Sequence, residues 1–170
     1  MKQQKKGFTI IEVVLVLAIA GLIFLMVFIA LPALQSGQRN TERKDNLSRF
    51  VASATEYASN NSGKSPFENT RTTEIDAYIK KYIISTGTEQ SQFTDPSGNV
   101  YKFVNKGFPA SPTNTGIVPD TDTAGDGNVY YVNKAACDQD ENRVRAGAGK
   151  RQFALLMMLE GGSVACADNQ

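Results

Sequence analysis

The sequence contains no histidine and no tryptophan, and only 2 of its 170 residues are cysteines. Without an imidazole, neither a Ser-His-Asp nor a Cys-His catalytic arrangement is possible, and zinc binding through histidine is excluded. No glycine-rich phosphate loop precedes a predicted helix, and the carboxylates show no recognisable pairing. We therefore expect a protein that is not an enzyme and requires no cofactor.

Long apolar runs are also absent, except for one near the N-terminus. No residue from Val13 to Leu34 carries a formal charge, and a helix of about 22 residues would span roughly 33 Å, enough to cross a bilayer core. Lys2, Lys5 and Lys6 precede it, and such a basic flank stays in the cytoplasm. The sequence therefore predicts a single-pass protein of the cytoplasmic membrane with its C-terminus outside. A cleaved secretory signal would have a shorter apolar core.

A distinctive stretch joins the basic flank to the apolar run: Lys6-Gly7-Phe8-Thr9-Ile10-Ile11-Glu12. This stretch is similar to the processing site of type IV prepilins and pseudopilins. The resemblance implies that a prepilin peptidase cleaves between Gly7 and Phe8 and methylates the new amine of Phe8. It also assigns Glu12 to filament assembly.

Glu12 also attracts attention on physical grounds, because a carboxylate near a bilayer is costly and needs a partner. After cleavage, the amine of Phe8 would lie four residues earlier on the same helical face. That amine could belong to the same chain or to a neighbouring subunit, where it would set the register between helices. The alternative is that Glu12 complements the positive N-terminus of its own helix.

The residues after the apolar run predict a long helix that continues into a head. Pro32 predicts a kink or local opening of the helix. Residues 35–46 are polar and predict a solvated neck. Apolar residues then return at spacings of three and four, which predicts a face packed on a domain, and Asn60-Asn61-Ser62-Gly63 is a typical helix end. We divide the chain into a leader (1–7), a transmembrane and filament-core helix (8–34) and an extracytoplasmic head (35–170).

The rest of the head has an α+β pattern. Residues 73–85 are predicted to form a second amphipathic helix, and strands are predicted at 100–104, 129–132 and 153–159. Residues 95–101 resemble in part the Asp-Pro-x-Gly turn of major pseudopilins, although Ser97 stands where tryptophan is usual. The fold class is therefore α+β, with a long N-terminal helix packed against a small antiparallel β-sheet and a C-terminal disulfide loop.

The two cysteines, Cys137 and Cys166, lie in the part predicted to be outside the cytoplasm, where thiols tend to pair. A disulfide closing a loop of roughly 30 residues would stabilise the domain by about 3.5 kcal/mol. The pair also resembles the C-terminal disulfide loop of many pilins. A reactive or metal-binding pair is the alternative, but it lacks a histidine or a third cysteine.

Residues 120–128 form an acidic, glycine-containing stretch. Asp120, Asp122, Asp126 and Asn128 offer hard oxygen ligands of the kind that calcium prefers. The spacing differs from an EF-hand, and a plain surface loop is the alternative. Major pseudopilins hold calcium in a C-terminal loop, so the resemblance also allows calcium here.

The charge balance argues against nucleic acid as a partner. Removal of residues 1–7 takes 3 of the 18 basic residues and none of the 17 acidic ones, which leaves 15 basic against 17 acidic residues and a formal charge of −2. Such a chain has no global attraction to phosphate. A local patch of Arg143, Arg145, Lys150 and Arg151 beside Tyr130 and Tyr131 is the remaining candidate for anion binding.

Together these features predict a subunit of a type IV pilus or pilus-like filament that serves adhesion or motility. Its expected partners are the prepilin peptidase, the assembly machinery, other pilin subunits and a host or abiotic surface, and its expected final location is extracellular. One alternative is a pseudopilin of a type II secretion or DNA-uptake system. The other is a membrane-anchored binding protein or enzyme that does not polymerise.

Overall fold

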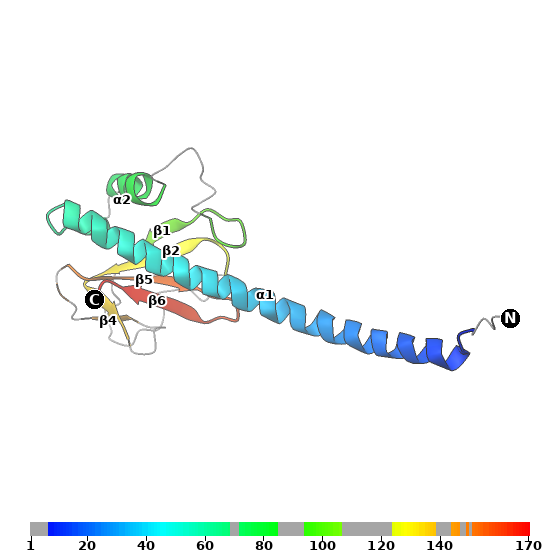
Figure 1. Cartoon of the computed structure of the whole chain (residues 1–170). Coiled ribbons are helices and arrows are strands. Elements are labelled where there is room, and N and C mark those ends of the chain that lie inside the picture. Colours follow the sequence, from blue (N-terminus) through cyan, green and yellow to red (C-terminus); the bar gives the residue numbers. More distant parts are fainter. Residues whose placement is uncertain are drawn as a thin grey trace. The chain divides into compact units, whose positions relative to one another are not determined.

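The computed structural model describes residues 7–68, 72–84, 94–106, 124–138, 144–146, 149 and 151–170. The chain divides into two compact units, Met1–Gln38 and Arg39–Gln170. The first unit contains the start of helix α1 (Ile10–Asn60), and the second contains the rest of α1 and all other elements (Figure 1).

Helix α1 ends where the sequence predicts. Asn60 is its last residue, and Ser62 and Gly63 then adopt positive φ angles of 58° and 79°. The Gly63 N–H donates to the Ala58 carbonyl at 2.7 Å, which satisfies one of the free carbonyls of the last turn. The helix continues through Pro32 without interruption, so the chain has no local opening there, and the alternative of a kink at Pro32 stays a prediction. Proline costs one backbone hydrogen bond, and the flanking turns remain helical in this apolar sequence.

The head contains a four-stranded sheet with the order β1-β2-β5-β6. Its strands are β1 (Lys102–Asn105), β2 (Asn128–Asn133), β5 (Phe153–Met158) and β6 (Val164–Asp168). The pairs β2–β5 and β5–β6 are antiparallel, as predicted, whereas β1 and β2 are parallel. The sheet is therefore mixed. Parallel neighbours need a long connection, and the chain between β1 and β2 is long enough for one.

Three strands were not predicted from the sequence: β6 and the short strands β3 (Ala135–Cys137) and β4 (Val144–Ala146). β3 and β4 form a separate two-stranded sheet. The predicted second helix is present as α2 (Thr72–Tyr78), followed by a π-helical turn, η1 (Ile79–Ile83). The last predicted residue of that helix, Ser85, lies outside the described residues.

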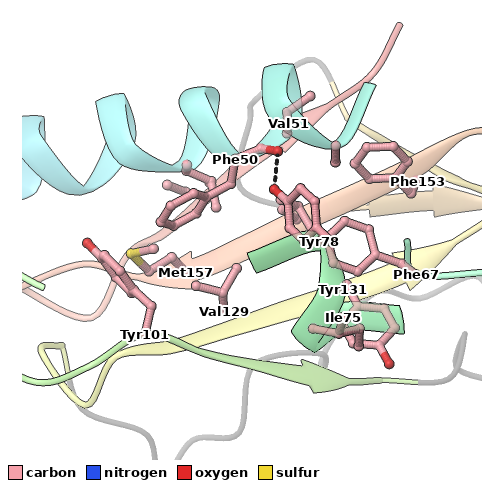
Figure 2. Close-up of a cluster of buried hydrophobic side chains, with 14 of the residues drawn as sticks. Phe50, Val51, Phe67, Ile75, Tyr78, Tyr101, Val129, Tyr131, Phe153 and Met157 are labelled. Atoms are coloured by element: carbon pink, nitrogen blue, oxygen red, sulfur yellow. Dashed lines mark hydrogen bonds between the residues drawn. The ribbon is translucent and has the colours of Figure 1, made fainter. Parts of the chain in front are cut away.

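Alternating side chains of the sheet enter two cores. In β5, Phe153, Leu155 and Met157 belong to the core that contains α1, while Ala154 and Leu156 belong to the core that contains β3 and β4. Figure 2 shows the first core, in which Tyr78 of α2 donates a hydrogen bond to the Phe50 carbonyl of α1 at 2.8 Å. The aromatic ring of Phe67, which is fully buried, stacks on Tyr131 with centroids 4.9 Å apart. The predicted stripe on α1 is thus a packing surface.

Candidate functional site

The candidate processing site lies at the start of α1. Thr9 directly precedes the helix, and Glu12 is in its first turn. The Thr9 hydroxyl donates to Glu12 Oε2 at 3.2 Å, and the Thr9 N–H lies 3.4 Å from the same oxygen. The spacing and contacts are those of one half of a capping box, in which an acid at the third helical position reaches back to the cap. With the Gly7–Phe8 bond intact, Glu12 contacts its own helix terminus, and the role of Glu12 in assembly stays a prediction.

The first part of α1 presents apolar side chains to its surroundings. Phe8 is 87% exposed and Leu34 is 60% exposed, and the large apolar side chains between them are also exposed. By length and composition, α1 is long and apolar enough to cross a membrane. Glu12 is the one acidic residue in its first turn. Exposed apolar surfaces of this extent are typical of segments that contact lipid or other protein.

The predicted disulfide is present. Cys137 of β3 and Cys166 of β6 are bonded, with their Cα atoms 5.8 Å apart. The Cys137 N–H also donates to Asp168 Oδ2 at 2.5 Å. The disulfide and this hydrogen bond attach the β3–β4 pair to the edge of the main sheet.

A buried ion cluster in the head was missed by sequence reasoning. Arg43 of α1 is fully buried, so the predicted solvated neck is wrong at this position. Its Nε and Nη2 bind Asp95 Oδ2 and Oδ1 at 2.7 and 2.9 Å, and Nη2 also contacts Ser97 Oγ at 2.9 Å. Its Nη1 contacts Glu160 Oε1 at 3.0 Å and Asn40 Oδ1 at 3.2 Å. All five donors of the guanidinium are therefore used.

The cluster continues toward the surface at Glu160, in the turn between β5 and β6. Arg39 Nε and Nη2 donate to the two oxygens of Glu160 at 2.6 and 2.8 Å. Asn40 Nδ2 donates to the Glu160 carbonyl at 3.1 Å, and the Glu160 N–H donates to Asn40 Oδ1 at 2.8 Å. Successive turns of α1 thus bind two distant turns of the head. No local sequence signal could have revealed these pairs, because the partners of Arg43 lie 52 and 117 positions away.

The buried pair determines the protonation of Asp95. Burial by itself would raise the pKa of this carboxyl, but the hydrogen bonds from Arg43 and from the Ser97 N–H outweigh it and hold the pKa below its ordinary value. The hydrogen bond with Asp95 raises the pKa of Arg43 against the opposing effect of burial. Asp95 and Arg43 are therefore both charged at neutral pH.

The predicted calcium ligands are only partly described. Asp120 and Asp122 lie outside the described residues. Asp126 is exposed and Asn128 begins β2. In the described part of the chain, no group of three or more acidic, cysteine or histidine side chains is placed to hold a metal. Calcium binding here stays a prediction.

The predicted anion patch loses its aromatic partners. Tyr130 and Tyr131 are 3% and 2% exposed, because both strand faces of β2 are covered. They are not available to stack on nucleic-acid bases. Of the four basic residues, Arg143 and Lys150 lie outside the described residues.

Comparison with known proteins identifies the N-terminal segment. Residues 2–28 match the family model described as the prokaryotic N-terminal methylation motif. This motif is the signature of type IV pilins and prepilins, so the chain carries a prepilin signature followed by the apolar part of α1. No curated protein and no solved structure matches the chain.

Proposed function

We propose that this protein is the structural subunit of a type IV pilus or pilus-like filament used for adhesion or motility. The observation that carries the proposal is the methylation motif at residues 2–28, which runs into a helix whose apolar side chains are exposed from Phe8 onward. An exposed apolar helix is suited first to lipid and then to packing against identical helices.

The proposed maturation begins in the cytoplasmic membrane. The prepilin peptidase cleaves the Gly7–Phe8 bond and methylates the amine of Phe8. The new cation appears one helical turn before Glu12, which in the uncut chain contacts Thr9. In the filament, Glu12 of one subunit pairs with the Phe8 amine of a neighbour, because a counter-charge offsets the cost of placing a carboxylate in an apolar bundle. Residues 1–7 are then the leader, 8–34 the filament core and 35–170 the exposed head.

Mass spectrometry of the protein from membranes and from sheared cell surfaces tests the proposal. We expect loss of residues 1–7 and one added methyl group on Phe8. Gly7→Val should block both changes, whereas Gly37→Val should leave them intact; Gly37, like Gly7, has no atom within 4 Å of an added Cβ. An intact N-terminus in the natural protein would instead support an anchored protein that does not polymerise.

Electron microscopy of cells with and without the gene separates the two filament roles. Abundant surface fibres that disappear with the gene would identify a pilus subunit. A processed and methylated protein without such fibres would identify a pseudopilin of a secretion or DNA-uptake system.

A further inference from the structure

Three charged residues of alternating sign lie along the part of α1 that belongs to the head. Glu42, Arg49 and Glu56 follow one another at intervals of seven residues, and all three are exposed. Seven residues make almost two helical turns, so the three side chains project from nearly the same face, about 10.5 Å apart along the axis. None of these side chains takes part in a hydrogen bond or an ion pair with another described residue. This face of α1 therefore carries charges that the fold of a single chain leaves unpaired.

A groove separates two of these charges. It has a volume of about 300 Å³, and both Arg49 and Glu56 line it. Between them, the groove is lined by Ala52, which is exposed, and Ser53, which is half-buried, and Tyr82 of η1 also lines it. Small side chains on a helix let a second helix approach to an interaxial distance of about 8–10 Å. The charged face can therefore accept another helix between Arg49 and Glu56.

The order of the charges is complementary to the same face of a second, parallel copy, but only after a displacement. Without displacement, each charge would meet a charge of its own sign. A displacement by seven residues places Glu42 of the second copy opposite Arg49 of the first, and Arg49 of the second opposite Glu56 of the first. A displacement by 14 residues leaves only Glu42 against Glu56. Of these three registers, the one displaced by seven residues alone pairs opposite charges, and exposed pairs of this kind select a register even though they add little affinity.

We propose that this charged face of α1 binds the same face of a second copy of the chain, parallel to it and displaced by seven residues. The inference rests on the proposed function, because insertion of every copy into one membrane makes their helices run in the same direction. A displaced contact cannot close on itself, so it repeats into an open filament. When the face points toward the filament axis, Arg49 of each copy meets Glu56 of one neighbour and Glu42 of the other.

Cysteine crosslinking of sheared fibres tests the register. Asp45 and Ala52 are both exposed on α1 and seven residues apart, so the proposed displacement brings Asp45 of one copy level with Ala52 of the next. After mild oxidation, we expect the Asp45→Cys/Ala52→Cys protein to give a ladder of disulfide-linked multimers. Each single variant should stay monomeric, and so should Asp45→Cys/Ser59→Cys, which matches a displacement by 14 residues. A double variant without a ladder, or a dimer in a single variant, which would indicate unstaggered or antiparallel helices, would overturn the proposal.

Charge reversal tests whether the pairs matter for assembly. Arg49→Glu makes all three charges negative and should reduce the yield of sheared fibres several-fold. The triple variant Glu42→Arg/Arg49→Glu/Glu56→Arg inverts every charge, keeps the copies complementary to one another, and should restore the yield. Lys64→Glu makes the same charge change at an exposed position after the end of α1 and should leave the yield unchanged. A normal yield for Arg49→Glu, or a triple variant that assembles no better than Arg49→Glu, would contradict the proposal.

The natural protein separates a failure of this contact from a failure of the filament role. A natural chain that is not cleaved after Gly7 and forms no fibres contradicts the filament role, and the contact with it. Natural fibres, together with cysteine variants that form fibres but give no ladder, contradict only the register.

Discussion

At the scale of single residues, the most constrained side chain of the head is Arg43. It lies in a helical stretch that looks solvated in the sequence, yet it is fully buried and bound to Asp95 and Glu160. Taking a charge out of water costs several kcal/mol, and the cost is offset only when every polar atom finds a partner. The five N–H donors of the Arg43 guanidinium all find acceptors, whereas a lysine ammonium has only three donors and lacks the planar geometry.

Loss of Arg43 should therefore destabilise the head strongly. Arg43→Met leaves Asp95 buried without its counter-charge, and removal of one partner of a buried pair costs about 3–5 kcal/mol. Arg43→Lys keeps the charge but loses the bidentate geometry, so we expect an intermediate loss. The measurement is urea unfolding of the full chain in detergent micelles, followed by the near-ultraviolet circular dichroism of the tyrosines. Arg49→Met, at an exposed position on the same helix, is the control. Equal stability of the Arg43 and Arg49 variants would contradict this role.

The same pair predicts a pH dependence. The pKa of Asp95 is lower in the folded head than in the unfolded chain, so the unfolded state binds the proton more readily. The contribution of Asp95 to stability is therefore complete above its unfolded pKa of about 3.9 and is lost as the pH falls through the lower folded value. Asp95→Asn should lower the melting temperature at neutral pH. As the pH falls into the acid range, the melting temperature of this variant should decrease less steeply than that of the natural protein. Asp45→Asn, an exposed change on α1, should preserve the natural acid slope. An unchanged slope in Asp95→Asn would show that other carboxyls determine it.

At the scale of elements, sequence patterns predicted what depends on local chemistry. The end of α1 at Asn60 follows from residues that tolerate positive φ, and β2 and β5 follow from their continuous buried runs. β6 was missed because small side chains carry little hydrophobic signal, and β3 and β4 because each has only 3 residues. The parallel direction of β1 could not be predicted, since it depends on the path of the connection to β2.

The turn before β1 and the loop before β2 are joined by hydrogen bonds beside the ion cluster. Asn99 Nδ2 donates to the Gly125 carbonyl at 2.6 Å, and the Lys102 N–H donates to the Gly127 carbonyl at 2.8 Å. A Cβ added to Gly127 would lie 2.5 Å from the Val100 carbonyl oxygen. The loop that precedes β2 thus approaches the turn before β1 too closely for any side chain at this position.

Two glycine substitutions distinguish the steric cost of an added Cβ from the cost of a positive φ angle. Gly127 and Gly98 both have positive φ, 75° and 91°, but an added Cβ at Gly98 meets nothing within 4 Å. Gly98→Ala should therefore cost about 1–2 kcal/mol for the left-handed conformation alone. Gly127→Ala must also displace backbone and should cost roughly 1–3 kcal/mol more. Thermal unfolding of the two variants under identical conditions measures the difference. Equal melting temperatures would show that the two loops move apart without cost.

At the scale of the whole molecule, the chain combines two environments. From Arg39 to Gln170 apolar side chains are gathered into two cores, whereas the helix between Phe8 and Leu34 exposes its apolar side chains. The uncharged run predicted an apolar segment that ends at Leu34, whereas the compact units of the structure meet between Gln38 and Arg39, and the assignment of residues 8–34 to a filament core stays a prediction. The sequence could not decide what Glu12 binds. The contact with Thr9 belongs to the uncut chain, and the partner in a filament depends on a second molecule.

Substitution of Glu12 tests that partner. Glu12→Val removes the carboxylate but keeps the apolar helix, so membrane insertion and cleavage at Gly7–Phe8 should continue while incorporation into fibres falls sharply. Loss of the half capping box alone would cost only about 0.5–2 kcal/mol of local helix stability, too little to remove the protein from the membrane. Glu68→Val, at an exposed position after the end of this helix, is the control for loss of a negative charge. The measurement is the amount of each variant in sheared fibres divided by its amount in membranes. If Glu12→Val enters fibres as readily as Glu68→Val, then Glu12 acts only at its own helix terminus and the charge pair between subunits does not exist.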